Sequence, residues 1–438
     1  MKTKLVTVLL ALYAMSAQAQ TTPEEKLNMA MYAVTNMYVD SIDKSKFVDA
    51  EIAKILKSLD PFSEYLPPMV AKANEDAILG HVPSPQGNVQ AQAPAAKNTY
   101  TPAQGPSTIK SYYMANKTTG YICLTMFAET TISDFKKAIT ELKAKGMKDL
   151  VLDLRNNGGG LFDVAVALAD EFLDGDKVIV QTKGAHVPSE TFKAKTKGVM
   201  EKGRLVLLVS DQTKSAAEIF SAAIRDWDRG LLVGKTTFGK GLIQETLPFS
   251  DGSALRITVA RYVTPAGMSI QKPYNGMAFA DSTRVWKSML HHRPLLCRGG
   301  VEADVKVDAQ TDYMTNWYAL ITYSGVQSAV GRKFVEDLKD SLMKKYPTAD
   351  KFIRDFSTSD DLMKAVRKTA EGAGIPTSSA DYDKSESMVK VQMKAVICSQ
   401  LYHDNNLYYK LFNENNDVVK RAMEIIGSNE YNKILNGK

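Results

Sequence analysis

The 438-residue sequence is poor in the side chains that build metal centres and disulfide frameworks. Its three cysteines, Cys123, Cys297 and Cys398, are far apart, so they form neither a metal-ligand spacing nor a disulfide framework. We expect the three cysteines to be buried free thiols. A disulfide is the alternative, because an oxidising compartment would permit one. The five histidines also show no ligand pattern, and nothing in the sequence indicates a metal ion or another cofactor.

Strong charge of one sign and long hydrophobic runs are also missing. The chain has 55 Lys and Arg against 49 Asp and Glu, and no basic stripe is interleaved with aromatic residues, so we expect no nucleic-acid binding. The apolar stretch at residues 5–15 is well short of the ~20 residues that a membrane-spanning helix needs, and no later stretch is long enough. We therefore expect no stable membrane anchor.

The N-terminus does carry a targeting pattern. Two lysines precede the apolar stretch at 5–15, and Ala17 and Ala19 form a small-x-small cleavage pair. This pattern predicts a secretory signal peptide at residues 1–19. The mature chain is then expected to be exported, and to be periplasmic or extracellular.

Apolar spacing divides the rest of the chain into four regions. Residues 20–70 have helical spacing, 71–107 form a proline-rich linker, 108–308 alternate between strand and helix patterns, and 309–438 are mostly helical. The alternation in the third region predicts an α/β core with largely parallel central strands. Active sites of such folds gather at the loops that follow the strands.

Ser215 lies after such a strand and at the start of a helix predicted over 216–227. A serine in this position is ordinarily a helix N-cap. However, Ala216 and Ala217 leave space above the hydroxyl, and the free N–H groups of the helix start would stabilise a developing oxyanion. Ser215 is therefore a candidate nucleophile as well as a candidate cap.

Lys240 lies between two glycines in the segment FGKG, before a predicted strand. A solvated loop lysine is the ordinary interpretation. Gln244 would share a strand face with Lys240, so its amide oxygen could orient the amine. A neutral lysine can deprotonate a serine, but lowering its pKa from ~10.4 to ~7.5 takes about 4 kcal/mol of destabilisation of the charged form. Burial can supply this, whereas a carboxylate partner would oppose it.

The segment DLRNNGGG at residues 153–160 follows another buried strand. Its glycines let backbone N–H groups approach a substrate closely. One of them, together with the N–H of Ala216, would form an oxyanion hole. A phosphate-binding loop or a plain turn is the alternative, although no P-loop lysine follows.

Together these segments resemble the carboxyl-terminal processing peptidases, also called tail-specific proteases. The matching motif is SAAEI at 215–219, Asp226, FGKG at 238–241 and Gln244, with Ala217 where the family pattern has a second serine. SLDPFSEYLPP, DLRNNGGG, DGSALRITVARYVTPAGMSIQ and GGVEADV also match family-like segments. The resemblance implies Ser215 as the nucleophile, Lys240 as the general base and Gln244 as the residue that orients it.

The resemblance also implies an oxyanion hole made by the amides of Ala216 and Gly160, with Gly159 as the neighbouring candidate. Asp226 matches a position regarded as important in the family, and a purely structural role is its alternative. The implied fold is α/β: a crotonase-like peptidase core of the ClpP/crotonase ββα type, with an N-terminal helical segment and a C-terminal helical domain.

Members of this family usually carry a PDZ domain before the core, and such a domain needs about 90 residues, within the ordinary size of a domain. Fewer residues than that lie between Pro68 and Gly120. We therefore expect the linker at 71–107 to stand in place of a PDZ domain. How the carboxylate of a substrate tail would be recognised is then an open question.

The sequence thus predicts an exported serine endopeptidase that acts through an acyl-enzyme. Cleavage specific for the C-terminal tails of substrates is one option for its specificity. Its expected partner is a protein or peptide substrate bound as an extended strand, and the terminal helices are candidates for a homodimer interface. A non-catalytic peptide-binding scaffold on the same fold is the alternative. A crotonase-like acyl-CoA enzyme is a third option, which the secretion signal disfavours.

Overall fold

The computed structural model describes residues 22–78, 107–275 and 284–437. The predicted signal peptide and most of the predicted linker lie outside the described residues. The chain divides into two units between Tyr65 and Leu66, and each is described by itself. In the described part of the chain, no helix combines the length and the apolar character needed to cross a bilayer.

The first unit contains two helices, α2 (Pro23–Met37) and α3 (Lys44–Leu59). The Thr22 hydroxyl accepts the backbone N–H of Glu25 at 3.2 Å, and the Glu25 carboxylate accepts that of Thr22, so α2 starts with a capping box. Asp43 caps α3 in the same way, through the N–H of Lys46. The helical pattern predicted for the start of region 20–70 is therefore present. A short strand, β1 (Glu64–Leu66), follows.

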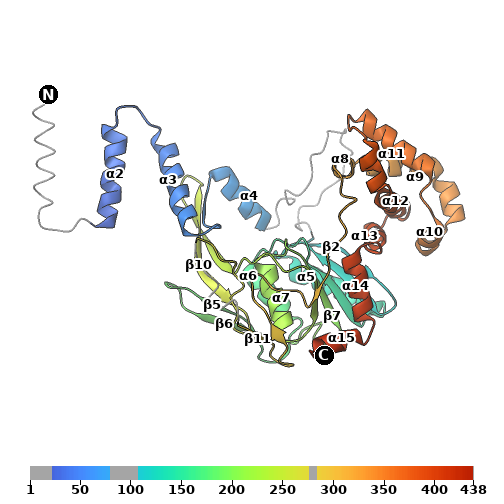
Figure 1. Ribbon diagram of the computed structural model, residues 1–438, viewed down its shortest axis with the longest axis horizontal. Coiled ribbons are helices and arrows are strands. Elements are labelled where there is room, and N and C mark those ends of the chain that lie inside the picture. The colour runs from blue at the N-terminus through green and yellow to red at the C-terminus, as the bar shows by residue number, and fades with distance from the viewer. Residues whose placement is uncertain (1–21, 79–106, 276–283, 438) are drawn as a thin grey trace, which may run out of the picture. The chain divides into compact units, whose positions relative to one another are not determined.

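The second unit begins with helix α4 (Pro68–Ile78), which occupies the first residues of the predicted linker. Its central element is a six-stranded sheet with the strand order β13-β8-β7-β4-β3-β2. Strands β2 and β7 of this sheet are labelled in Figure 1. All neighbours are parallel except β2 and β3, which form an antiparallel hairpin. The strands are β2 (Ile109–Met114), β3 (Thr119–Leu124), β4 (Asp149–Asp153), β7 (Leu205–Val209), β8 (Leu231–Gly234) and β13 (Val305–Lys306).

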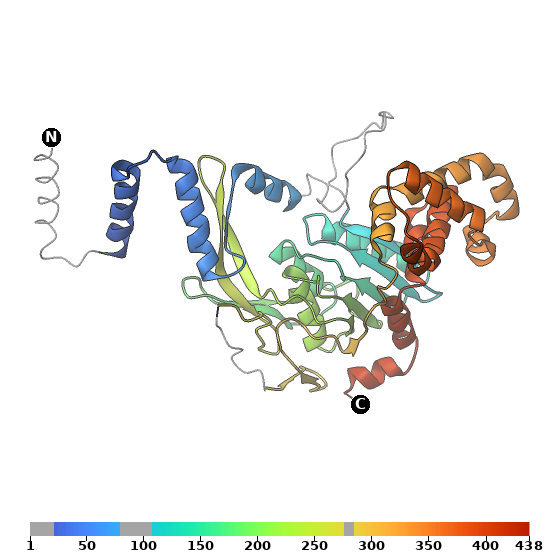
Figure 2. The same cartoon turned by 45° about the horizontal axis from the view of Figure 1, so that its top comes forward.

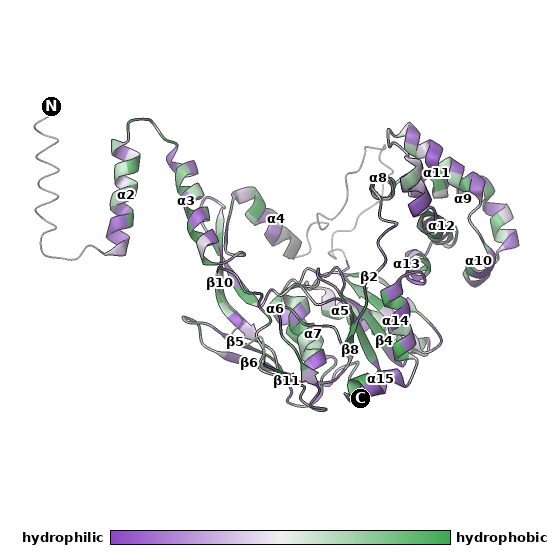
Figure 3. Ribbon diagram, viewed as in Figure 1, coloured by the Kyte–Doolittle hydropathy of each residue, from purple (hydrophilic) through white to green (hydrophobic). Residues whose placement is uncertain are grey.

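The central strands are hydrophobic along their length because helices cover both faces of the sheet (Figure 3). Every residue of β7 is buried, as its unbroken sequence LVLLV predicts. On one face lie α5 (Thr131–Ala144), α6 (Phe162–Asp170) and α7 (Ala216–Asp226). Their aromatic side chains meet in the core, where the rings of Phe135 and Phe220 both pack against Phe172.

A second, antiparallel sheet contains β9 (Leu242–Pro248), β10 (Ala254–Val263), β5 (Val178–Lys183) and β6 (Glu190–Lys193). The order of these strands is β9-β10-β5-β6. Helix α7 contacts both sheets, through β8 of the first and β5 of the second. The start of α7 therefore lies next to the loop that enters β9. A small two-stranded pair, β11 (Trp286–Lys287) and β12 (Pro294–Leu295), completes the strands.

The remaining helices form two groups. The first group buries a core of its own around Trp317, Phe352, Val366 and Met393. The second group packs its apolar side chains against the other face of the six-stranded sheet (Figures 1 and 2). The first group is α8 (Asn316–Tyr323), α9 (Val326–Lys345), α10 (Ala349–Asp355), α11 (Asp360–Gly372), α12 (Ser379–Tyr402) and α13 (Asn405–Asn413); the second is α14 (Asp417–Ile426) and α15 (Glu430–Leu435).

This second group lies within residues 309–438, the region predicted to be a C-terminal helical domain, and it packs on the central sheet. In α14 and α15 the buried residues include Val418, Ile425 and Tyr431, and they join one cluster with Val151 and Val206 of the central sheet. The two helices therefore belong to the core by packing. Helical periodicity could not distinguish this, because an amphipathic helix shows the same pattern whether its apolar face covers a sheet or another helix.

Candidate active site

Ser215 occupies the turn between β7 and α7 in a backbone conformation that is uncommon for a serine. Its φ is 58° and its ψ is −121°, and positive φ is rare outside glycine. Such a conformation costs of order 1–3 kcal/mol and persists only where the surroundings enforce it. A sharp, strained strand-to-helix turn that presents a serine is also the device used by the nucleophile elbow of α/β-hydrolases. The N-cap position that the sequence predicts is therefore occupied, but in a strained form.

Glu218 enforces part of this geometry. Its buried carboxylate accepts four hydrogen bonds, from the backbone N–H groups of Ser215, Gly239 and Lys240 and from the hydroxyl of Thr237. The distances from the N–H groups of Ser215 and Lys240 are 2.9 and 2.8 Å. Burial raises the pKa of Glu218 above its ordinary value, although the hydrogen bonds favour the charged form. One side chain thus ties the start of α7 to the loop that carries Lys240.

Tyr262 on β10 makes a second tie between the same two residues. Its hydroxyl lies 3.2 Å from the carbonyl oxygen of Ser215 and also contacts that of Lys240. Burial raises the pKa of Tyr262 well above its ordinary value, so the hydroxyl keeps its proton and remains a donor. Ser215 and Lys240 are therefore held next to each other through their backbones, although 24 residues of chain separate them.

The lysine side chain contacts Gln244. The amine Nζ of Lys240 donates to the amide oxygen Oε1 of Gln244 at 2.6 Å. The flanking glycines are needed for close approach: Gly239 has φ 91°, and a Cβ at Gly241 would lie 2.9 Å from the backbone nitrogen of Gln271. The lysine is half-buried rather than fully solvated, unlike an ordinary loop lysine.

The glycine loop is fixed by Asn157, which is fully buried. Its amide nitrogen donates to the carbonyl oxygen of Leu124, and its amide oxygen accepts the N–H of Gly159 at 2.9 Å. Gly160 has φ 137°, and a Cβ there would lie 2.0 Å from the carbonyl oxygen of Phe127, so only glycine fits. The N–H of Gly159 is thus engaged within the loop. Among the described residues, the N–H of Gly160 has no hydrogen-bond acceptor.

One cavity of about 370 Å³ brings these elements together. Ser215, Ala216, Gly160, Lys240 and Gln244 all line it, whereas the predicted alternative Gly159 does not. Its apolar walls are formed by Leu161, Phe162, Ile219 and Leu242, and Asn74 of α4 also lines it. The arrangement holds a hydroxyl, an amine and two backbone amides around a space that suits a peptide segment.

Asp226 lies outside this cavity. Its buried carboxylate pairs with the Arg225 guanidinium at 3.0 Å and accepts the backbone N–H of Ala266 at 3.1 Å. These contacts attach the end of α7 to the loop after β10. They support the structural alternative for this residue.

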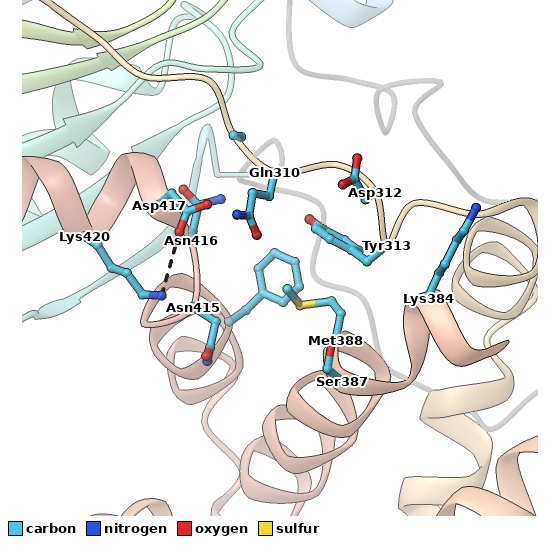
Figure 4. Close-up of a pocket in the computed structure, with 12 residues that line it drawn as sticks. Gln310, Asp312, Tyr313, Lys384, Ser387, Met388, Asn415, Asn416, Asp417 and Lys420 are labelled. Carbon is cyan, nitrogen blue, oxygen red and sulfur yellow. Dashed lines mark ion pairs between the residues drawn. The ribbon is translucent and has the colours of Figure 1, made fainter. Parts of the chain in front are cut away.

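Arg155, at the start of the glycine loop, also has structural contacts. Its guanidinium pairs with the buried Asp153 at 2.6 Å and donates to the amide oxygen of Asn416, the N-cap of α14, at 2.7 Å. Asn416 also lines a second cavity, of about 250 Å³, between residues 309–313 and helices α12 to α14 (Figure 4). That cavity contains none of the predicted site residues.

Glu218, Tyr262 and Asn157 are the members of the site that the sequence did not single out. A signal existed for Glu218, since a glutamate three residues after an N-cap serine is typical of a capping box. The contacts of Tyr262 had no local signal, because they join residues 22 and 47 positions away.

The three cysteines are free, as expected; Cys398 is buried, while Cys123 and Cys297 are half-buried.

Comparison with known proteins finds similarity to two families. Residues 118–277 match peptidase family S41, and residues 317–404 match DUF8443, a family of unknown function. The segment that is similar to family S41 includes Ser215, Lys240 and Gln244. The predicted α/β peptidase core with a C-terminal helical region is confirmed.

Several similar proteins are carboxyl-terminal processing proteases, as the motifs predicted. The chloroplastic C-terminal processing peptidase of Tetradesmus obliquus is 42% identical over 160 residues, which are 36% of this chain and 34% of that protein. The carboxy-terminal processing protease CtpA of Bacillus subtilis is 36% identical over 187 residues, 40% of each chain. The solved photosystem II D1 C-terminal processing protease is 36% identical over 43% of this chain and 42% of its own, with a TM-score of 0.35. The chain thus matches 34–42% of the length of these proteins.

Proposed function

We propose that this chain is an exported serine endopeptidase that cleaves protein substrates with Ser215 as the nucleophile and Lys240 as the general base. The observation that carries the proposal is the contact between the Lys240 amine and the Gln244 amide oxygen on the wall of the cavity that Ser215 also lines. The similarity of residues 118–277 to family S41 supports the same class of reaction.

In the first step, the neutral amine of Lys240 removes the proton from the Ser215 hydroxyl while its oxygen attacks the scissile carbonyl carbon. The negative charge moves onto the carbonyl oxygen of the tetrahedral intermediate. The N–H groups of Ala216 and Gly160 would donate to this oxygen, because neither is engaged within the described structure. Gly159 is the weaker candidate, since its N–H is already donated to Asn157.

The intermediate then collapses and the C–N bond breaks. Lys240 returns its proton to the leaving amine, and an ester joins the acyl part of the substrate to Ser215. A water molecule, deprotonated by Lys240, attacks the ester carbon in the second half of the reaction. The carboxylic acid leaves, and Ser215 regains its proton.

A substrate would bind as an extended strand beside β9. Among the described strands, β9 pairs only with β10, so its other edge offers backbone groups for strand addition. Leu242, Ile243, Gln244 and Thr246 of β9 line the cavity. Main-chain pairing at this edge would place a peptide bond alongside Ser215 largely independently of its side chains.

Cleavage assays with single-residue variants test the proposal. We expect the mature protein to cleave an unfolded protein substrate. Both Ser215→Ala and Lys240→Ala should abolish cleavage, while the thermal unfolding midpoint of each variant stays within a few degrees of the wild-type value. A fluorophosphonate probe should label Ser215 of the wild type, as found by mass spectrometry of the digested protein. Full activity of either variant would refute the mechanism. Peptide binding without cleavage by the wild type would favour the scaffold alternative.

Export and self-association are part of the proposal and have separate tests. N-terminal sequencing of the protein purified from its native cells should begin at Gln20, and a mature chain that begins at Met1 would refute export. A homodimer through the terminal helices predicts twice the monomer mass in sedimentation. A monomer at micromolar concentration would refute it.

A further inference from the structure

The glycine loop is attached to the C-terminal helices through a pair of side chains. Arg155 at the start of the loop pairs with Asp153 through Nη2 at 2.6 Å, and its Nη1 donates to the amide oxygen of Asn416 at 2.7 Å. Asn416 lies between α13 and α14, 261 positions further along the chain. The contact therefore links the loop that would hold the oxyanion to a region outside the segment that is similar to family S41.

Asn416 holds Arg155 from a fixed position. The same oxygen, Oδ1, accepts the backbone N–H of Val419 at 3.2 Å and so caps α14. Helix α14 packs on β4 and β7, the two strands that lead to the glycine loop and to Ser215. Because this packing fixes the start of α14, it also fixes the oxygen that accepts from Arg155.

Arg155 is in turn connected to the groups that would bind the oxyanion. Its backbone carbonyl accepts the hydroxyl of Ser210, which lies in the turn between β7 and α7. Two residues further on, the backbone carbonyl of Asn157 accepts the N–H of Lys214 at 3.1 Å. The side chain of Asn157 also fixes the turn that precedes Gly160. A displacement of Arg155 would therefore move the N–H of Gly160 relative to the start of α7.

We propose that Asn416 positions the oxyanion hole through Arg155, so that the C-terminal helices support catalysis without touching the substrate. This inference rests on the proposed function, because the N–H of Gly160 has this role only if a serine attacks a carbonyl group there. A guanidinium presents several N–H groups in one plane, and Asp153 engages one side of that plane. Without the Asn416 oxygen, Nη1 would lose its acceptor within the described residues, and Arg155 would turn toward a new one.

A purely structural role for this pair is the alternative, and kinetics separates the two roles. The negative charge on the carbonyl oxygen develops in the transition state, so a displaced oxyanion hole lowers kcat and leaves KM nearly unchanged. Loss of folded protein instead lowers the number of active molecules. Titration of the active sites to completion with the fluorophosphonate probe counts these molecules, so kcat per titrated site reports the geometry alone.

Two substitutions of Asn416 separate its contact with Arg155 from its cap. Serine caps helices as well as asparagine does, but its shorter side chain does not extend to Arg155. We expect Asn416→Ser to lower kcat per titrated site about tenfold, which is less than the loss on removing a whole oxyanion donor, with KM within about twofold. Asn416→Asp keeps an oxygen for both donors and should retain at least about half of the wild-type kcat. Asp404→Ser, at the cap of α13, is the control and should leave both constants unchanged.

A variant of Arg155 tests whether the effect passes through this residue. Arg155→Lys keeps a positive charge for Asp153 and loses the nitrogen that reaches Asn416. It should lower kcat by a similar factor, and adding Asn416→Ser to it should lower kcat by less than about twofold more. This variant also decides the question if Asn416→Ser does not fold, since a wild-type kcat for Arg155→Lys would overturn the inference.

Amide hydrogen exchange of the loop gives a measurement that needs no activity. In Asn416→Ser, peptides that cover residues 154–162 should exchange faster than in the wild type, while the exchange of β7 stays unchanged. If the wild type cleaves no substrate, the proposed function fails, and faster exchange of the loop would still support its link to Asn416. Unchanged exchange in that case would overturn the link. A wild-type kcat per titrated site in Asn416→Ser would also overturn the inference, as would a further tenfold loss when Asn416→Ser is added to Arg155→Lys.

Discussion

The amine of Lys240 lies 2.6 Å from the amide oxygen of Gln244, an acceptor that carries no charge. A carboxylate at this distance would favour the protonated amine and prevent it from acting as a base at neutral pH. An uncharged amide oxygen can orient the amine and favours the protonated form less strongly than a carboxylate would. The choice of a neutral partner is therefore the feature that makes a lysine base chemically reasonable here.

Replacing Gln244 with glutamate should move the pH dependence of activity. The added negative charge raises the pKa of Lys240, so the active neutral amine forms only at higher pH. We expect the rising limb of kcat/KM against pH to shift upward by about one to three units. Gln212→Glu, which adds the same charge at an exposed position three residues before Ser215, is the control and should leave the profile in place. An unshifted profile for Gln244→Glu would argue against Lys240 as the base.

Replacing Ser215 with glycine should raise the free energy of unfolding above that of the wild type by about 1 kcal/mol. Glycine adopts φ 58° without the strain of about 1–3 kcal/mol that serine has there, which stabilises the folded state. Part of this gain is offset because glycine also makes the unfolded chain more flexible. Urea denaturation measures the difference. Ser378 caps α12 with an ordinary φ of −77° and a side-chain hydrogen bond, so Ser378→Gly should lower stability instead. A loss of stability in Ser215→Gly would show that the serine acts mainly as a cap.

Exchanging Glu218 for glutamine should lower both stability and activity. The amide group turns two hydrogens toward a site that already holds four donors, so buried donors lose their acceptor. We expect a loss of about 2–4 kcal/mol in the free energy of unfolding and at least a tenfold fall in kcat/KM. The matched control is Glu371→Gln on the exposed surface of α11. A change below 0.5 kcal/mol would mean that Glu218 does not hold the two loops together.

Acid should destabilise the protein partly through Asp153. Burial raises the pKa of this carboxyl, but the Arg155 guanidinium and the Tyr121 hydroxyl outweigh burial and hold it below its ordinary value of 3.8. A carboxyl with a lowered pKa in the folded state stabilises the protein above its ordinary pKa, and this contribution is lost as pH falls toward the folded value. The urea midpoint should therefore decline as pH falls from 5 to 3.

Asp153→Asn isolates this contribution. The variant should be less stable at pH 7, because Arg155 loses its charged partner, and should show a shallower decline below pH 4 than the wild type. Asp211→Asn at the exposed turn before Ser215 should keep the slope of the wild type. Parallel curves for Asp153→Asn and the wild type would contradict the assignment.

Local patterns in the sequence were sufficient for the elements that carry the site. The run LVLLV predicts a buried strand and forms β7, and the helix predicted over 216–227 is α7 at Ala216–Asp226. The sequence also suggested that the Gln244 amide oxygen could reach the Lys240 amine, and the two atoms are 2.6 Å apart, although Lys240 lies in the loop before β9 and not in the strand itself. The chemistry of the two side chains could be argued from the same short segment.

Contacts between distant segments could not be predicted in this way. The capping position of Glu218 relative to Ser215 is local, but its bonds to Gly239 and Lys240 require the folded core. The bond from Arg155 to Asn416 spans 261 positions and has no local pattern at either end. The same limit applies to the packing of α14, because its partner, the far face of the sheet, is defined only once the sheet exists.

The placement of α14 and α15 on the central sheet has a consequence for the timing of maturation. The strand that leads to Ser215 keeps an apolar face open until Val418 and Ile425 arrive from much later in the chain. A polypeptide caught midway through synthesis would lack these side chains, so one face of its sheet would still be uncovered. The turn that carries Ser215 would therefore reach its final packing only after the helices near the C-terminus have been made.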